Sequence, residues 1–244
     1  MLRVATLATR DDISNGSFGV RRSSSSGCAL NQPAPHQVRF EKDVLKSIEC
    51  VKAKFGGVNV LINSAGIVDY ENIYDFKNKK PHSADLYRCV FETNVWSLVN
   101  ITRLMVGLMT KNKQDSNQQR GVIINLPSTM AYEPPPGLVA YDITKSAVSG
   151  MTIPLARGLA LQRIRIITNC LGYIDSPMTA AEEKKETRRW STMISALKRC
   201  ETYEEVAHLI QACIKNPLIN DENIRIDMGY RYNQGGDSQG HSKC

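Results

Sequence analysis

The sequence predicts an α/β protein with a Rossmann-like, doubly wound parallel sheet, and two observations carry this prediction. Apolar residues at helical spacing alternate with short apolar runs typical of buried strands, from about residue 41 to residue 227. The composition, 42% hydrophobic and 23% charged residues, is that of a globular protein and excludes a disordered chain. No run of about 18 or more apolar residues occurs, so no membrane-spanning helix is expected.

The first regular element is a helix that begins at Glu41 and ends at Gly56-Gly57, because a glycine pair stops a helix. Its core face is expected to carry four apolar residues at helical spacing: Val44, Ile48, Val51 and Phe55. The apolar run Val58–Ile62 then predicts a short buried strand, which ends at the small residues of Asn63–Gly66.

A polar loop with a lysine cluster follows, and we expect the cluster on the solvated surface: Lys77, Lys79 and Lys80. Ser83 is expected to cap a long helix that runs toward Met109. The inward residues of this helix are expected to be Leu86, Val90, Val95, Leu98 and Ile101. Val122–Ile124 predicts the next strand.

The second half of the chain continues the alternation. A helix begins near Val139 and carries its apolar face past Leu159, with a bend expected at Pro154, because proline lacks a backbone N–H. The capping box Thr202-x-x-Glu205 predicts a last helix. Two further strands are predicted, Ile164–Thr168 and Asn223–Asp227.

We expect three segments: a divergent, poorly ordered N-terminal stretch over 1–36, the α/β domain over 37–232, and a polar tail over 233–244. The first stretch is rich in serine and arginine, which is typical of a mitochondrial transit peptide. Asp11 and Asp12 oppose that interpretation and favour a frayed terminus, so both interpretations stay open.

Charge and cysteine content bound the partners. The formal net charge of +7 permits an anionic partner, but no stripe of basic residues interleaved with aromatics occurs, so direct nucleic-acid binding is not expected. Seven cysteines, an odd number without C-x-x-C, indicate free thiols in a reducing compartment rather than a disulfide framework. Since no histidine stands at ligand spacing with another histidine or a cysteine, no metal site is expected.

The string Tyr141-Asp-Ile-Thr-Lys145 carries the strongest chemical indication. Residues four apart lie on one face of a helix, so the phenol and the ammonium point the same way. A nearby cation favours the phenolate, and such a pair can exchange a proton with a carbonyl or alcohol oxygen. Alone, the pattern is as typical of a pair on the helix surface.

Three further features fit a site at the carboxyl edge of the sheet. Ser128 follows a predicted strand and could hydrogen-bond a substrate oxygen, although a turn serine is the alternative. Asn94 is mildly unfavourable within its helix, and a solvated position is the alternative. Asn63–Gly66 would let a ligand approach the backbone, or would be an ordinary strand-end turn.

These residues resemble the catalytic tetrad of the short-chain dehydrogenase/reductase family in order and spacing: Asn94, Ser128, Tyr141 and Lys145. Asn63–Gly66 resembles the family's N-N-A-G, with serine for the second asparagine. The segment 171–177 resembles its P-G-x-x-x-T-P, with leucine for proline and serine for threonine. The similarity extends from about Phe40 to Arg231.

The resemblance implies a role for each matching residue. Tyr141 would exchange the proton, Lys145 would favour the phenolate and hold the nicotinamide ribose, Ser128 would fix the reacting oxygen, and Asn94 would support a water-linked proton relay. The cofactor-lining residues that it implies, besides Tyr141 and Lys145, are Asn63, Ser64, Ala65, Gly66, Gly172 and Ser176.

The resemblance also implies the reaction, the cofactor and the partners. The reaction would be reversible hydride transfer between NAD and a secondary alcohol, with 3-hydroxyacyl-CoA thioesters or hydroxysteroids as small-molecule substrates. A homo-oligomer is expected, in mitochondria or otherwise in the cytoplasm. The alternative is a catalytically weak or inactive scaffold on the same fold, for example in mitochondrial tRNA processing.

The cofactor-binding N-terminal βαβ portion is incomplete in comparison with the family. The family's T-G-x-x-x-G-x-G turn is not found, and Asn15–Gly19 holds only two glycines before a serine- and arginine-rich stretch. Gln37-Val38 stands where the family has Asp-Val. Either this part is degenerate, or the recorded N-terminus is not the true one.

Overall fold

A five-stranded sheet in the order β1-β2-β5-β6-β7 forms the centre of the computed structural model. The structure describes residues 6–8, 37–176, 178–179, 190, 192–195 and 197–232. The strands are β1 (Thr6–Ala8), β2 (Val60–Asn63), β5 (Gly121–Asn125), β6 (Ile164–Leu171) and β7 (Glu222–Ile226). The sheet strands β2, β5, β6 and β7 run parallel to one another, as the sequence predicts.

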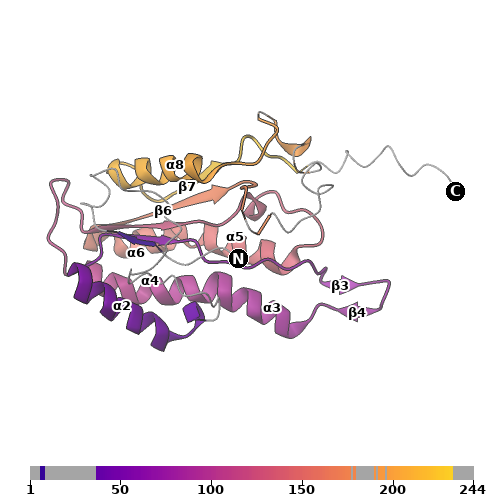
Figure 1. The fold of residues 1–244 in the computed structure, drawn as a ribbon, viewed down its shortest axis with the longest axis horizontal. Coiled ribbons are helices and arrows are strands. Elements are labelled where there is room, and N and C mark those ends of the chain that lie inside the picture. The colour runs from indigo at the N-terminus through magenta and orange to yellow at the C-terminus, as the bar shows by residue number, and fades with distance from the viewer. Residues whose placement is uncertain are drawn as a thin grey trace.

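Helices cover both faces of this sheet (Figure 1). They are α2 (Glu41–Phe55), α3 (Ala84–Phe91), α4 (Ser97–Met109), α5 (Val139–Gly150), α6 (Thr152–Leu159) and α8 (Tyr203–Lys215). A π-helical turn, η2 (Glu92–Trp96), joins α3 to α4. Among the described residues, short 3-10 turns are η1 (Gln37–Arg39), η3 (Thr129–Ala131) and η4 (Ala160–Gln162).

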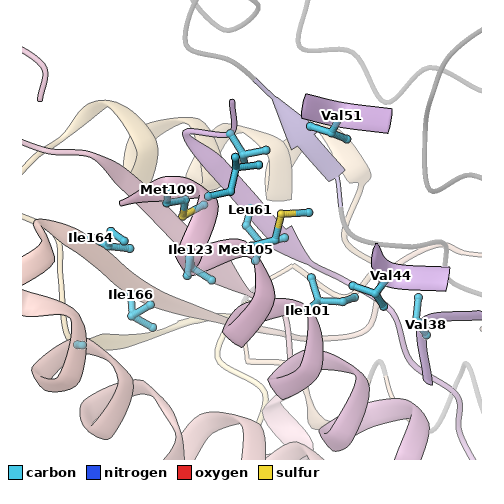
Figure 2. Packing of buried hydrophobic residues seen from close by; sticks show 13 residues of the cluster. Val38, Val44, Val51, Leu61, Ile101, Met105, Met109, Ile123, Ile164 and Ile166 are labelled. Atoms are coloured by element: carbon cyan, nitrogen blue, oxygen red, sulfur yellow. The ribbon is translucent and has the colours of Figure 1, made fainter. Parts of the chain in front are cut away.

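Strand residues alternate between two hydrophobic cores, because successive side chains of a strand point to opposite faces. Ile123 of β5 joins the first core, which α2, α4 and α6 cover (Figure 2). Its neighbour Ile124 joins the second core, against α8. The same alternation separates Leu61 from Ile62 in β2. Burial on both faces explains why these strands are nearly continuous apolar runs.

Helix ends follow the local sequence signals. Gly56 takes the left-handed conformation after α2, with φ of 74°. The Ser83 hydroxyl accepts a hydrogen bond from Leu86 N, which confirms the predicted cap. Thr202 and Glu205 form the predicted capping box at α8. Pro154 cannot donate a hydrogen bond to Gly150, and the predicted long helix is divided between α5 and α6 there.

Three local expectations differ from the structure. Phe55, predicted on the core face of α2, is the last residue of this helix and is 41% exposed, so the prediction is wrong at this position. The predicted lysine loop forms a small hairpin of β3 (Tyr74–Asp75) and β4 (Lys80–Pro81). Cys50 is disulfide-bonded, so the prediction of free thiols is wrong at this position. The prediction is confirmed at Cys89, Cys170 and Cys213.

The edge strand β1 is a feature that the sequence did not predict. It pairs with β2 in the antiparallel direction, with Thr6 opposite Ile62 and Ala8 opposite Val60. The chain therefore leaves β1 at the amino end of the parallel strands. The remainder of the predicted N-terminal segment, and the candidate loop Asn15–Gly19, lie outside the described residues.

In the part of the chain that the structure describes, no helix is both long and apolar enough to cross a membrane.

Candidate active site

Asn94 lies in the π-helical turn η2, which aims its amide into the protein. The residue is 2% exposed, so the alternative of a solvated position is wrong. Its Oδ1 accepts a hydrogen bond from Ile67 N at 2.8 Å, and its Nδ2 donates to Ile67 O at 2.9 Å. Nδ2 also donates to Thr144 Oγ1 of α5, at 2.9 Å. Asn94 thus joins η2 to α5 and to the segment that follows β2, and π-turns are frequent at functional sites.

Lys145 of α5 is buried in the same place. The residue is 7% exposed, and burial lowers the pKa of its ammonium to about 8. A Cβ atom at Gly66 would lie 3.1 Å from Lys145 Nζ and 3.4 Å from Asn94 Oδ1, so the missing side chain lets these groups meet. The structure therefore brings Gly66, Asn94 and Lys145 together in one group.

Tyr141 lies one helical turn before Lys145, and the ammonium is 5.1 Å from the centroid of its ring. This distance is within the range of a cation–π contact. The ring also packs against the cluster of Met130, Ile194 and Tyr230, to which Trp190 contributes. The phenol consequently has a cation on one side and an apolar surface on another.

Ser128 follows β5 and begins the turn η3, where its hydroxyl accepts a hydrogen bond from Met130 N at 3.2 Å. The residue is 7% exposed. Its turn is attached to α5, because Ser146 Oγ donates to Ala131 O at 3.1 Å. The structure thus places Ser128 beside the helix that carries Tyr141, and it also gives the hydroxyl the turn role that the sequence left open.

The predicted cofactor-lining residues divide into two places. Asn63 ends β2, and its Nδ2 donates to Asn125 Oδ1 at 2.9 Å across the carboxyl edge of the sheet. Ser64 and Ala65 continue from Asn63 to Gly66. Gly172 and Ser176 lie after β6 instead. The Cβ space at Gly172 is filled by the Glu201 side chain and by Asp227, so the glycine serves packing there. The Ser176 hydroxyl lies 3.1 Å from Thr179 Oγ1.

Sequence reasoning missed several polar residues that the fold gathers around this site. Thr144, inside the Tyr141–Lys145 string, donates its hydroxyl to Tyr141 O at 2.6 Å. Asp69 is buried against the first turn of α5, the buried side chain of His82 contacts Asp69, and Asp142 lies near Asp69. The string itself could have drawn attention to Thr144, whereas no sequence signal joins Asp69 to His82 or to α5.

Comparison with known proteins agrees with this geometry. The family model described as short chain dehydrogenase matches residues 32–187. The human 3-hydroxyacyl-CoA dehydrogenase type-2 is 37% identical over 198 residues, which are 81% of this chain and 76% of that protein. The Drosophila melanogaster protein of the same name is 38% identical, over 81% of this chain and 77% of its own length.

More distant proteins share the fold. A 3-oxoacyl-[acyl-carrier-protein] reductase of Thermotoga maritima is 30% identical over 78% of this chain and 73% of its own length. The crystal structure of a Mycobacterium avium 3-hydroxyacyl-CoA dehydrogenase type-2 superposes with a TM-score of 0.75 at 24% identity, over 80% of this chain and 76% of that one. The chain belongs to the short-chain dehydrogenase family, a family of oxidoreductases.

The family implies a nicotinamide dinucleotide as cofactor. The described residues fit the half that carries the nicotinamide and its ribose. Lys145 Nζ makes no hydrogen bond or ion pair within the described ranges, so its donors are available to ribose hydroxyls. The pyrophosphate half lacks such support in the described residues. A Rossmann glycine turn follows a parallel strand at the carboxyl edge, whereas the chain leaves β1 at the opposite edge.

Where side chains are described, no group of three or more histidine, cysteine, aspartate or glutamate residues could hold a metal ion.

Proposed function

We propose that this chain is an NAD-dependent oxidoreductase that transfers a hydride reversibly between NAD(H) and a secondary alcohol or ketone. The observation that carries the proposal is the buried ammonium of Lys145, which lies over the ring of Tyr141 and beside Gly66 and Asn94. Its relatives named 3-hydroxyacyl-CoA dehydrogenase type-2 support 3-hydroxyacyl-CoA thioesters as substrates. Hydroxysteroids are the second substrate class that we propose.

Each site residue has a defined task in this reaction. The Tyr141 hydroxyl exchanges the proton of the reacting oxygen, and the positive charge of Lys145 favours the phenolate. Lys145 also donates hydrogen bonds to the nicotinamide ribose, and the hydroxyl of Ser128 orients the substrate oxygen. Asn94 holds the backbone of Ile67 and supports the proton relay. When bound, NAD supplies the hydride acceptor.

The apolar surface beside Tyr141 supports a substrate with an apolar body. Met130, Trp190 and Tyr230 belong to the cluster against which the Tyr141 ring packs. Burial lowers the pKa of Lys145 to about 8, so the charge that favours the phenolate is present at neutral pH and is lost above that value in the free protein. The mitochondrial location, the homo-oligomer and the segment boundaries stay predictions.

The decisive test is NADH production from NAD and 3-hydroxybutyryl-CoA. We expect turnover by the parent chain and a loss of roughly 100-fold or more in Tyr141→Phe, because general acid–base catalysis contributes about that much. Tyr74→Phe is the matched control, since Tyr74 lies in the hairpin, and its activity should equal that of the parent. An inactive parent, or a fully active Tyr141→Phe, would overturn the proposal.

Cofactor binding is tested without catalysis by titrating NADH and following its fluorescence. We expect saturable binding that Lys145→Met weakens, because the methionine keeps the length of the side chain and removes the donors to the ribose. Absence of binding in a folded parent contradicts the proposal, and so does equal binding by Lys145→Met.

A further inference from the structure

Two buried ionisable side chains near α5 have no part in the mechanism above. Asp69 lies three residues after Gly66. His82 directly follows β4, the second strand of the hairpin that β3 and β4 form. Their side chains are 0% and 3% exposed, respectively. Burying a charged pair costs free energy unless hydrogen bonds satisfy both groups. The hydrogen bonds of Asp69 and His82 therefore indicate the role of the pair.

The imidazole of His82 faces oxygen atoms at both ring nitrogens. Its Nε2 lies 2.9 Å from Asp69 Oδ2, and its Nδ1 lies 2.9 Å from Ser83 O. A neutral imidazole carries a single N–H, so only the imidazolium donates at both ends. Burial by itself would lower the pKa of His82, but the hydrogen bonds to Asp69 and Ser83 and the charges of Asp69 and Glu71 raise it.

The second oxygen of Asp69 reaches the catalytic helix. Asp69 Oδ1 accepts a hydrogen bond from the backbone N of Tyr141 at 3.1 Å. Tyr141 is the third residue of α5, and the residue at the N-cap, Leu138, makes no side-chain cap. The first turn of a helix has N–H groups without partners inside the helix, and a carboxylate there is favoured by the helix dipole. A remote aspartate thus caps α5 at the residue that carries the phenol.

The segment that carries Asp69 is held at a second point. Asn94 binds both the N and the O of Ile67, two residues before Asp69. The chain between these points therefore ties η2 to the first turn of α5. A movement of Asp69 would shift Tyr141 relative to Lys145 and Asn94.

Other charged and titratable groups also face this pair. Asp142 of α5 is buried, and burial first and the Asp69 charge second raise its pKa to about 7. Glu71 Oε2 lies 3.6 Å from His82 Nδ1 and accepts a hydrogen bond from Ser83 N. The ring of Tyr87 in α3 contacts the His82 ring edge-on, at a centroid distance of 5.4 Å. The carboxyl groups of Asp69 and Glu71 thus favour the protonated form of His82 by raising its pKa.

We propose that Asp69 and His82 are positioning residues for Tyr141. The imidazolium holds the Asp69 carboxylate in place, and the carboxylate fixes the first turn of α5 and with it the phenol. The expected effect on kcat rests on the proposed function, whereas the ion pair and the cap on α5 do not. The two are therefore tested by separate measurements.

The ion pair is tested by NMR titration of the histidine side chains. His82 is one of four histidines, and its signal is the one that disappears in His82→Gln. We expect the titration midpoint of His82 to fall by roughly one pH unit or more in Asp69→Asn, since an opposite charge within hydrogen-bonding distance is removed. The same substitution at an exposed position of α3, Asp85→Asn, is the control and should leave the midpoint unchanged. An unchanged midpoint in Asp69→Asn overturns the proposal.

The cap on α5 is tested by amide hydrogen exchange. Asp69→Ala should raise the exchange rate at Tyr141 by roughly fivefold or more, because a net hydrogen bond of about 1 kcal/mol is lost. The β5 amides should keep their protection, which distinguishes a local effect from unfolding. Asp69→Asn retains the accepting oxygen and should show a smaller effect. Equal exchange at Tyr141 in the parent and in Asp69→Ala overturns the proposal.

Kinetics then connect the cap to catalysis. In an active parent, Asp69→Ala should lower kcat while KM for NAD stays close to that of the parent, and Asp69→Asn should recover part of kcat. A fall in affinity for NAD with kcat unchanged contradicts positioning of the phenol. If the parent has no turnover, the proposed function fails, and the NMR and exchange results still decide whether Asp69 and His82 position α5.

Discussion

Asp142 is a carboxyl group in a position from which water is largely excluded. The residue is 7% exposed, and burial together with the nearby Asp69 raises its pKa to about 7. A carboxyl group whose pKa is raised in the folded state stabilises the fold fully below its unfolded pKa. That contribution is lost as the pH rises toward about 7, so Asp142 destabilises the protein at neutral and higher pH.

We therefore predict that Asp142→Asn raises the free energy of unfolding more at pH 8 than at pH 5. The difference between the two pH values should be roughly 1–3 kcal/mol. The neutral amide replaces a charge that the buried site opposes. Urea unfolding at both pH values measures the effect. The exposed Asp85 provides the control, because Asp85→Asn should change stability little at either pH. A gain at Asp142 that does not depend on pH would contradict the prediction.

The elements of this fold end where backbone chemistry requires them to end. Gly56 closes α2 with a positive φ of 74°, and nothing lies within 4 Å of a Cβ atom placed there. Gly158 lies inside α6. A Cβ atom placed there would also have no atom within 4 Å, but the φ angle of Gly158 is not positive. The two glycines thus differ in backbone conformation and not in the space around them.

The same substitution should consequently have opposite effects at these two positions. Gly56→Ala should destabilise the protein by about 1 kcal/mol, because an L-residue is strained in the left-handed conformation. Gly158→Ala should stabilise it by about 0.5–1 kcal/mol, since alanine is the better helix former. Thermal and urea unfolding of both variants measure the signs, and two changes of the same sign would refute the explanation.

The π-turn η2 is a local feature that the apolar periodicity of the sequence does not show. The periodicity predicted one long helix toward Met109, and α3, η2 and α4 do follow one another without a break. Asn94 is buried within η2, where its amide bonds Ile67 and Thr144. A helical pattern of apolar residues does not report these contacts with distant segments, so the sequence left the solvated alternative for Asn94 open.

At the scale of the whole molecule, the sheet separates two cores that depend on strand residues pointing both ways. Ile123 and Ile124 are each 0% exposed and belong to different cores. Parallel strands covered on both faces derive their stability from this double burial. The carboxyl ends of β2 and β5 are in register at Asn63 and Asn125, which places the site residues after these strands at one edge.

Truncation of a central strand residue should thus be costly. We predict that Ile123→Ala lowers the free energy of unfolding by about 2–5 kcal/mol, since it leaves a cavity between the sheet and the helices. Leu161→Ala is the control, because Leu161 is 93% exposed, and its effect should stay within about 0.5 kcal/mol. Similar effects of both substitutions in urea unfolding would show that the first core is not tightly packed.

The positions of the parallel strands and of most helices along the chain could be predicted from the sequence, because local apolar periodicity and capping residues determine them. The capping box at Thr202 and the cap at Ser83 are examples, since a cap and its helix are neighbours in the chain. The Tyr141–Lys145 pair was predictable for the same reason, because a helix places residues four apart on one face.

Contacts between distant segments were decided by the tertiary structure alone. The antiparallel direction of β1 depends on its pairing with β2, more than fifty residues later, for which its own sequence contains no signal. Asp69 caps a helix 72 residues further along the chain, and His82 reaches Asp69 only because a hairpin folds between them. Hydrogen bonds and charges act through space, so only the folded chain determines which of these polar groups meet.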